Sequence, residues 1–186
     1  MRPTLIVVTG PPASGKTTVA RVIARELRLP SISKDTLKET LFEEIGWDDE
    51  LEPKFERAAL ALLFAVVEAQ LEVGVSVVAE SNFDSDSDVE PFRQLASEHD
   101  ARILQLHLER PKELLLARFA ERAASGRRHS AHRDHPRDID EVRARLEAGD
   151  WDPLDLPGEL LQFEIGKDAD EDAPAIAQRV RAMLEG

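Results

Sequence analysis

The stretch Gly10-Pro11-Pro12-Ala13-Ser14-Gly15-Lys16-Thr17-Thr18 follows the apolar run Leu5-Ile6-Val7-Val8 near the start of the chain. The apolar run is short, β-branched and ended by Gly and Pro, which predicts a central parallel strand that is buried on both faces. The stretch after it matches the pattern G-x-x-x-x-G-K-[ST], in which backbone amides surround a phosphate group. The sequence therefore predicts a strand, a phosphate-binding loop and a helix, in that order.

Each position of the loop has a physical role. Gly10 and Gly15 let the backbone turn tightly and approach a phosphate without a Cβ in the way. The prolines between them have no N–H, so the donors must come from later amides, at the positive end of a helix. Lys16 is expected to place its ammonium on the β- and γ-phosphates of a nucleotide, and the Thr17 hydroxyl is expected to bind Mg²⁺. The predicted nucleotide-binding residues of the loop are Gly10, Ala13, Ser14, Gly15, Lys16, Thr17 and Thr18.

The 186 residues carry a formal net charge of −13 and include no cysteine. This length fits one domain, with a core that needs no disulfide framework. The charge argues against a protein that coats nucleic acid, because phosphate contacts need clustered Lys and Arg. No uncharged run is long enough to span a membrane, and the first strand begins too early to leave room for a signal peptide. We expect a soluble cytoplasmic protein, and nothing in the sequence indicates a partner protein.

The remaining chain alternates short apolar runs with amphipathic segments. Strands are expected near residues 31–33, 75–79, 103–108 and 160–165. Helices are expected from the loop to just before Pro30, near residues 33–45, 53–73, 89–99, 111–124 and 139–148, and from Pro174 onward. Such alternation predicts an α/β fold, with one domain over residues 1–186, a five-stranded parallel sheet and helices on both faces. Residues 125–137 are rich in Arg and His and are predicted to form a mobile surface segment.

Two carboxylates are expected at the carboxyl ends of the strands, where parallel sheets bind their ligands. Asp35 is able to accept the proton of a substrate hydroxyl, or to cap a helix as Asp commonly does. Glu80 is able to hold Mg²⁺ directly or through water, or to be a strand-end carboxylate satisfied by neighbouring amides. Asn82 and Phe83, just beyond, are expected to supply the substrate with one hydrogen bond and one apolar wall.

Arginine is clustered after residue 117 against an acidic background. Arg118 and Arg122 lie four residues apart on one helical face, and Arg127, Arg128 and Arg133 follow. Guanidinium groups suit the charge on the equatorial oxygens of a transferring phosphoryl group. Arg122 and one of Arg127 or Arg128 are predicted to have this role, and the alternative is a solvated helical face.

Five other residues support weaker hypotheses. His129, His132 and His135 are spaced by three, but without Cys and in a polar loop they favour phosphate contacts or surface polarity over a zinc site. Trp47 and Trp151 are expected to be packed rather than to wall a substrate pocket.

These motifs resemble the P-loop kinases of the nucleoside-monophosphate-kinase-like group, and most closely the set that includes chloramphenicol phosphotransferase, gluconate kinase, zeta toxins and polynucleotide kinases. The resemblance implies a three-layer P-loop NTPase sandwich with strand order 2-3-1-4-5 and an Arg-rich lid, at residues 125–137, that closes over ATP. It implies that Asp35 acts on the substrate, that Arg118 lies against the adenine and that residues 166–168 form the adenine loop. Under this resemblance the catalytic residues are Lys16, Asp35, Arg122 and Arg128, the substrate-binding residues are Asp35, Lys38, Asn82 and Phe83, and the Mg²⁺ ligands are Thr17 and Glu80.

The sequence and the resemblance together predict an ATP- and Mg²⁺-dependent kinase that transfers the γ-phosphoryl group to a hydroxyl of a small molecule. A polynucleotide 5′-hydroxyl kinase would share every residue named above, but the acidity of the chain and the lack of a long basic track count against it. A non-kinase protein that uses ATP binding as a switch is a further alternative. Acceptor-dependent consumption of ATP would distinguish the three.

Overall fold

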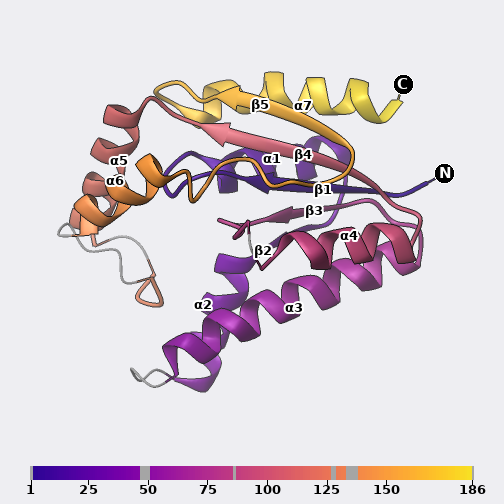
Figure 1. Cartoon of the computed structure of the whole chain (residues 1–186), viewed down its shortest axis with the longest axis horizontal. Coiled ribbons are helices and arrows are strands. Elements are labelled where there is room, and N and C mark those ends of the chain that lie inside the picture. Colours follow the sequence, from indigo (N-terminus) through magenta and orange to yellow (C-terminus); the bar gives the residue numbers. More distant parts are fainter. Residues whose placement is uncertain (1, 47–50, 86, 127–128, 133–137, 186) are drawn as a thin grey trace.

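The computed structural model of the chain describes residues 2–46, 51–85, 87–126, 129–132 and 138–185. Within these residues, five parallel strands form one sheet in the order β2-β3-β1-β4-β5 (Figure 1), which confirms the predicted fold class. The strands are β1 (Thr4–Thr9), β2 (Ser31–Ser33), β3 (Val77–Glu80), β4 (Arg102–Glu109) and β5 (Glu159–Glu164). The helices are α1 (Lys16–Leu27), α2 (Lys34–Ile45), α3 (Glu52–Glu72), α4 (Val89–Glu98), α5 (Lys112–Ala124), α6 (Ile139–Ala148) and α7 (Ala169–Glu185).

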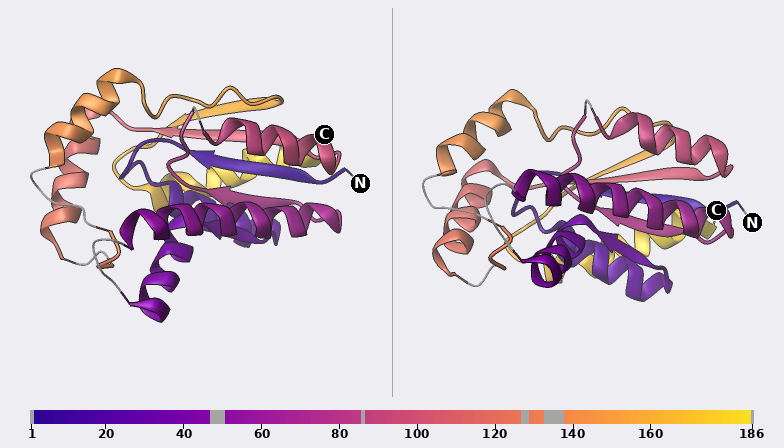
Figure 2. Two further views of the ribbon diagram at one scale, coloured as in Figure 1. Left: turned by 60° about the horizontal axis from the view of Figure 1, so that its bottom comes forward. Right: turned by 90° about the horizontal axis from the view of Figure 1, so that it is seen from below.

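Helices cover both faces of the sheet, with α1 and α7 on one face and α3 and α4 on the other (Figures 1 and 2). Successive residues of β1 point to opposite faces, so Ile6 and Val8 enter the first core while Leu5 and Val7 enter the second. All four side chains are fully buried, as their unbroken apolar run predicted. Helix α3 has 21 residues, yet neither it nor any other helix in the described ranges is apolar enough to cross a membrane.

The carboxyl ends of all five strands lie at one end of the molecule, because the strands are parallel. Helices α5 and α6 stand beyond this end, while β1 begins and α7 ends at the opposite one (Figure 1). Leu115 and Phe119 of α5 pack with Val142 of α6 in a small core of their own. Helix α2 starts at the same end of the sheet, so α2 and α5 flank the loop that follows β1.

Strand β3 begins later than predicted, at Val77 rather than at residue 75. The amide of Val75 donates to the carbonyl oxygen of Gln70 at 2.9 Å, which completes the end of α3. The Val75 side chain is 38% exposed and contributes little to the sheet. The predicted start of β3 was wrong because it was based on apolar character alone.

Helix α7 begins earlier than predicted, at Ala169 rather than at Pro174. A side-chain oxygen of Asp168 accepts a hydrogen bond from the amide of Asp170 at 3.0 Å, which stabilises the earlier start. Pro174 is then inside the helix, where it has no amide hydrogen to donate and its ring crowds the carbonyl group one turn earlier.

Candidate active site

The phosphate loop connects β1 to α1 and has a backbone shape that depends on its glycines. Gly10 has a φ of 134°, and a Cβ at this position would lie 2.2 Å from the carbonyl oxygen of Leu108 on β4. A side chain would therefore collide with the backbone of the neighbouring strand, so the chain leaves β1 by this route only with glycine. Ala13 also has a positive φ, of 64°, and such strained residues occur most often at ligand sites.

Lys16 begins α1 and folds back over the loop. Its Nζ donates to the carbonyl oxygen of Pro11 at 2.6 Å and to Ser14 Oγ at 3.5 Å, and the residue is 6% exposed. The first turn of α1 contains no acidic residue. The positive end of the helix and the ammonium group therefore reinforce each other at one place, which suits a phosphate group.

Thr17 and Glu80, the two residues predicted to bind Mg²⁺, are in contact. Thr17 Oγ1 donates to Glu80 Oε1 at 3.3 Å, and Ser33 Oγ donates to Glu80 Oε2 at 2.8 Å. The sheet register explains the second contact, because Ser33 on β2 pairs with Glu80 on β3. Burial raises the pKa of Glu80, although the charge of Lys16 and the hydrogen bond from Ser33 oppose the rise. A divalent cation would favour the ionised carboxylate, and Mg²⁺ accepts carboxylate and hydroxyl oxygens as ligands.

A pocket of about 180 Å³ joins the phosphate loop to the carboxyl ends of the strands beside it. Asp35 enters this pocket from the first turn of α2, and Ser33, not Asp35, occupies the capping position of that helix. Asp35 is therefore not the capping residue of α2, although its charge lies in the first turn, at the positive end of the helix. The residues that line the pocket are Pro12, Ala13, Gly15, Lys16, Thr17 and Thr18 from the loop and α1, and Asp35, Glu80, Ser81, Asn82, Arg118 and Arg122 from the surrounding elements.

Arg118 and Arg122 line the same pocket from one face of α5. The guanidinium of Arg122 lies 5.6 Å from the centre of the Phe119 ring, a cation–π distance that helps to hold it in place. Cationic groups on the α5 side thus face the two carboxylates across the pocket. The other arginines named from the sequence, Arg127, Arg128 and Arg133, lie outside the described residues, as does Trp47.

Two side chains predicted to contact the substrate are packed elsewhere. Phe83 is 1% exposed and packs edge to face on Phe92, with ring centroids 4.9 Å apart, inside the core beneath α4. Lys38 is 4% exposed, and its ammonium group pairs with Glu56 on α3. Burial of an aromatic ring lowers the free energy of the folded state, and a buried charge is far less costly when it is paired. Both partners lie on other elements, Phe92 on α4 and Glu56 on α3. Of this predicted set, Asn82 does line the pocket, together with Asp35.

The described part of the predicted lid packs against α2. His129 Nε2 lies 3.3 Å from Glu43 Oε1, and His132 Nε2 lies 2.8 Å from Glu39 Oε1. The two glutamates lie four residues apart on α2, on one face of the helix. Ala131, between the histidines, is fully buried, so this part of residues 125–137 is not the purely exposed segment that its composition predicted.

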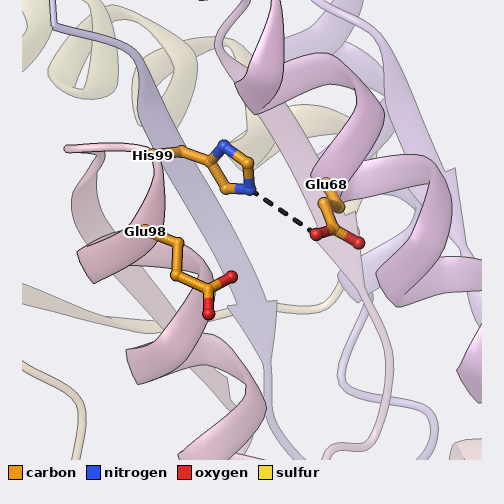
Figure 3. A group of neighbouring side chains, drawn as sticks. All are labelled: Glu68, Glu98 and His99. Carbon is orange, nitrogen blue, oxygen red and sulfur yellow. Dashed lines mark ion pairs between the residues drawn. The ribbon is translucent and has the colours of Figure 1, made fainter.

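The zinc hypothesis receives no support from the described residues. Among them, the group of His, Asp and Glu close enough to share a metal ion is Glu68, Glu98 and His99, which come from α3 and the end of α4 (Figure 3). Both glutamates are exposed, and His99 Nε2 lies 3.7 Å from Glu68 Oε1, so a surface ion pair accounts for the contact. His135, the third histidine of the hypothesis, lies outside the described residues.

Trp151 and Arg110 complete the surroundings of the site. Trp151 is 8% exposed and packs beside Ala13 of the loop, with the guanidinium of Arg145 4.6 Å from its ring centre, so it is packed as predicted. Arg110, directly after β4, was not singled out from the sequence, yet it is 7% exposed and donates to the carbonyl oxygen of Ser14 at 3.3 Å. In the sequence, Arg110 could have been noticed as an arginine at the ligand-binding end of a strand. Charged residues that follow strands are also common on protein surfaces, so this position alone does not indicate a site.

The fold and this pocket define a P-loop nucleotide-binding protein of the kinase-like class. Residues 5–148 match a protein-family model described as an AAA domain, and the chain belongs to this family of P-loop kinase-like domains. A kinase-like relative among the solved structures supports a phosphotransferase.

Three solved structures illustrate the similarity. A protein from Chloroflexus aurantiacus J-10-fl, proposed to be a kinase, is 36% identical, with a TM-score of 0.85 over 98% of this chain and 96% of that chain. Kti12 from Chaetomium thermophilum, in complex with ADP-AlF3, is 23% identical, with a TM-score of 0.64 over 96% and 97% of the two chains. The APS kinase CysC from Mycobacterium tuberculosis, in complex with AMPPNP and APS, is 20% identical, with a TM-score of 0.58 over 100% and 99%. The last two establish likeness of fold alone, and the curated proteins contain no significant match to the chain.

Proposed function

We propose that this protein is an ATP- and Mg²⁺-dependent kinase that transfers the γ-phosphoryl group to a hydroxyl of a small-molecule acceptor. The observation that carries the proposal is that one pocket unites Lys16 and Thr17 with Asp35, Glu80 and Arg122. Phosphoryl transfer needs cations around the transferring group, a metal ion between the phosphates and an acceptor held in line with the bond that breaks. The pocket offers a group for each of these tasks.

On the nucleotide side, Lys16 and the amides at the start of α1 hold the β- and γ-phosphates. Thr17 and Glu80 hold the Mg²⁺ that neutralises these phosphates, which is consistent with their contact at 3.3 Å. Arg122 stabilises the equatorial oxygens of the transferring group, assisted by Arg128, and Arg118 on the same face of α5 lies against the adenine.

On the acceptor side, Asp35 orients the acceptor hydroxyl and takes its proton. The acceptor oxygen forms a bond to the γ-phosphorus, the bond from this phosphorus to the β–γ bridging oxygen breaks, and ADP leaves. Asn82, at the mouth of the pocket beyond β3, supplies a hydrogen bond that positions the acceptor.

The charge of the protein favours a small acceptor over a polynucleotide. A formal net charge of −13 repels a long polyanion. Three of the four carboxylates on α2 border the pocket or the lid, since Asp35 lines the pocket and Glu39 and Glu43 contact the lid histidines. A 5′-hydroxyl polynucleotide would have to pass these carboxylates to reach the pocket.

The test is ATP consumption with Mg²⁺ over a panel of hydroxyl compounds: antibiotics, sugars, nucleosides and a 5′-hydroxyl oligonucleotide. Lys16→Ala is the inactive variant, and Lys54→Ala, an exposed lysine in the first turn of α3, is the matched control that keeps activity. Stimulation by a small molecule in the wild type and in Lys54→Ala, but not in Lys16→Ala, supports the proposal. Stimulation by the oligonucleotide alone, or tight ATP binding with no stimulation by any compound, contradicts it.

A further inference from the structure

Arg110 occupies a position between two loops that are far apart in the sequence. It follows β4 directly, and its guanidinium lies between the phosphate loop and the turn after β5. Nε donates to the carbonyl oxygen of Ser14 at 3.3 Å, while Nη1 donates to the carbonyl oxygens of Gly166 and Lys167, the latter at 3.3 Å. One planar group thus connects the backbone of both loops.

The residues on either side of the Gly166–Lys167 turn pack against the phosphate loop. A Cβ added at Gly15 would lie 2.8 Å from the Cβ of Ala169 and 3.7 Å from Cγ2 of Ile165, so the close packing here requires glycine in the loop. The amide of Gly166 donates to a carboxylate oxygen of Asp172 at 2.8 Å, which fixes the other side of the turn. Arg110 and Asp172 therefore both hold the backbone of Gly166, one at its carbonyl oxygen and the other at its amide.

The strand order places this turn on the side of the phosphate loop opposite to Asp35 and Asn82. Asp35 and Asn82 follow β2 and β3, which lie on one side of β1, whereas Gly166 follows β5, beyond β4 on the other side. A nucleotide whose phosphates lie on the loop, with its γ-phosphate toward Asp35, must extend its nucleoside toward β4 and β5. The turn at Gly166 and Lys167 borders that path.

The burial of Arg110 carries a cost for folding. Its Nη2 is buried and has no hydrogen-bond partner in the described ranges, and burial lowers the pKa of the guanidinium, with the nearby charge of Arg118 adding to this effect. A buried donor without a partner destabilises the folded state. A cost of this kind is tolerated most readily where the side chain has a task besides stability.

We propose that Arg110 is a positioning residue for the nucleotide. It holds the Gly166–Lys167 turn at a fixed distance from the phosphate loop, so that the nucleoside of ATP binds to a surface that is already formed. The inference rests on the proposed function, because the γ-phosphate is placed toward Asp35, but it does not depend on which compound is the acceptor. Preorganisation of such a surface strengthens binding because the turn no longer loses conformational freedom when the nucleotide arrives.

The experiment compares the dissociation constants of ATP and of inorganic tripolyphosphate, both with Mg²⁺, measured by titration calorimetry. The variants are Arg110→Lys, which keeps the charge but cannot reach both loops with one ammonium group, and Arg110→Met. Arg102→Lys is the matched control, since Arg102 also joins β4 to distant elements, through Glu159 and the carbonyl oxygen of Met183, but at the opposite end of the strand. Thermal unfolding of each variant checks that it is folded.

We expect both Arg110 variants to bind ATP about tenfold more weakly while their affinity for tripolyphosphate changes less than about threefold, because only ATP contacts the turn. The control should bind both ligands as the wild type does. An equal loss of affinity for both ligands would show that Arg110 acts only through the phosphate loop or the fold. Wild-type affinity for ATP in Arg110→Lys would show that the connection between the two loops is not needed. Either result overturns the inference while leaving the proposed function intact, whereas a wild-type protein that binds neither ligand overturns both.

Discussion

Asp35 is the residue on which the proposed chemistry depends most directly. It lines the pocket from the first turn of α2 without occupying the capping position of that helix. Asp35→Asn keeps the shape and removes the ability to take a proton, so we expect ATP binding to be unchanged and turnover to fall by at least roughly a hundredfold. Acceptor-dependent ADP release at saturating ATP measures the turnover, and titration of the variant with ATP measures the binding.

A matched control for Asp35→Asn is Asp140→Asn. Asp140 also lies in the first turn of a helix, α6, but it is exposed and does not line the pocket. Its variant should turn over as the wild type does. Near-normal turnover in Asp35→Asn would remove Asp35 from the mechanism, and a loss in both variants would indicate a general effect of losing negative charge at a helix start.

His107 makes the stability of the protein depend on pH. It is 2% exposed on β4, and burial lowers its pKa from the usual value of 6.5, although the neighbouring charge of Glu109, whose Oε1 lies 3.2 Å from Nε2, acts in the opposite direction. As pH falls below 6.5, the unfolded chain takes up a proton at this residue before the folded protein does. The free energy of unfolding should therefore decrease with falling pH, by at most about 1.4 kcal/mol per pH unit, until the pH passes below the folded pKa.

The measurement for His107 is urea unfolding between pH 7.5 and pH 5 for the wild type and His107→Gln. Because glutamine does not titrate, the variant should lose less stability than the wild type over this range, and the other titrating groups contribute equally to both curves. Parallel curves would mean that His107 has the same pKa in the folded and unfolded states.

The residues that were placed correctly from the sequence are those whose position depends on their neighbours in the chain. Lys16 and Thr17 belong to one motif whose spacing specifies its own backbone, and the structure brings both into the pocket. Phe83, Lys38 and Arg110 could not be placed in this way, because their partners lie on other elements: Phe92, Glu56 and the turn after β5. A single sequence does not reveal such pairings.

At the scale of elements, an ion cluster joins α2 to α3. Glu56 on α3 pairs with the ammonium groups of Lys38 and Lys34 on α2, the latter at 3.1 Å. Burial alone would raise the pKa of Glu56, but the charge of Lys34 and the hydrogen bond from Lys38 outweigh it and hold the pKa below its usual value. The cluster fixes α2, and with it Asp35, against the rest of the molecule.

The cluster provides a test of the hypothesis that Lys38 binds the substrate. In Lys38→Met, an apolar side chain of similar size replaces a buried ammonium group, and Glu56 still pairs with Lys34. We therefore expect the free energy of unfolding to change by less than about 1 kcal/mol. Glu56→Gln leaves Lys38 buried without its counter-charge and should cost about 1–3 kcal/mol. Acceptor KM should be unchanged in Lys38→Met. A KM raised tenfold or more, with stability unchanged, would return Lys38 to the substrate site.

Element boundaries were predicted correctly where a stop signal stood at the boundary, and were wrong where a particular hydrogen bond decided the boundary. The start of α7 depends on the Asp168 side chain, and the start of β3 depends on how the end of α3 is completed by Val75. The periodicity of apolar residues does not reveal either of these contacts. Both errors are shifts along an element and leave its face toward the core unchanged.

At the scale of the whole molecule, the alternation of strands and helices was sufficient to predict a parallel sheet covered on both faces. The strand order came from the resemblance to P-loop kinases, since crossover length does not specify on which side of β1 the next strand pairs. The structure confirms that order, and it places the ends of β1, β2 and β3 around one pocket. The lid was predicted only as a segment, because its packing on α2 through His132 and Glu39 is another pairing between distant residues.

Binding of ATP should stabilise the whole molecule, because the phosphate loop, α2 and α5 all border the pocket and the unfolded chain has no such site. At an ATP concentration one hundred times its dissociation constant, with Mg²⁺, the stabilisation is about 2.7 kcal/mol, which for a domain of this size raises Tm by roughly 5–11 °C. Lys16→Ala should lose most of this shift and Lys54→Ala should retain it. Differential scanning fluorimetry over an ATP series measures all three proteins, and an unchanged Tm in the wild type at millimolar ATP would contradict nucleotide binding at this loop.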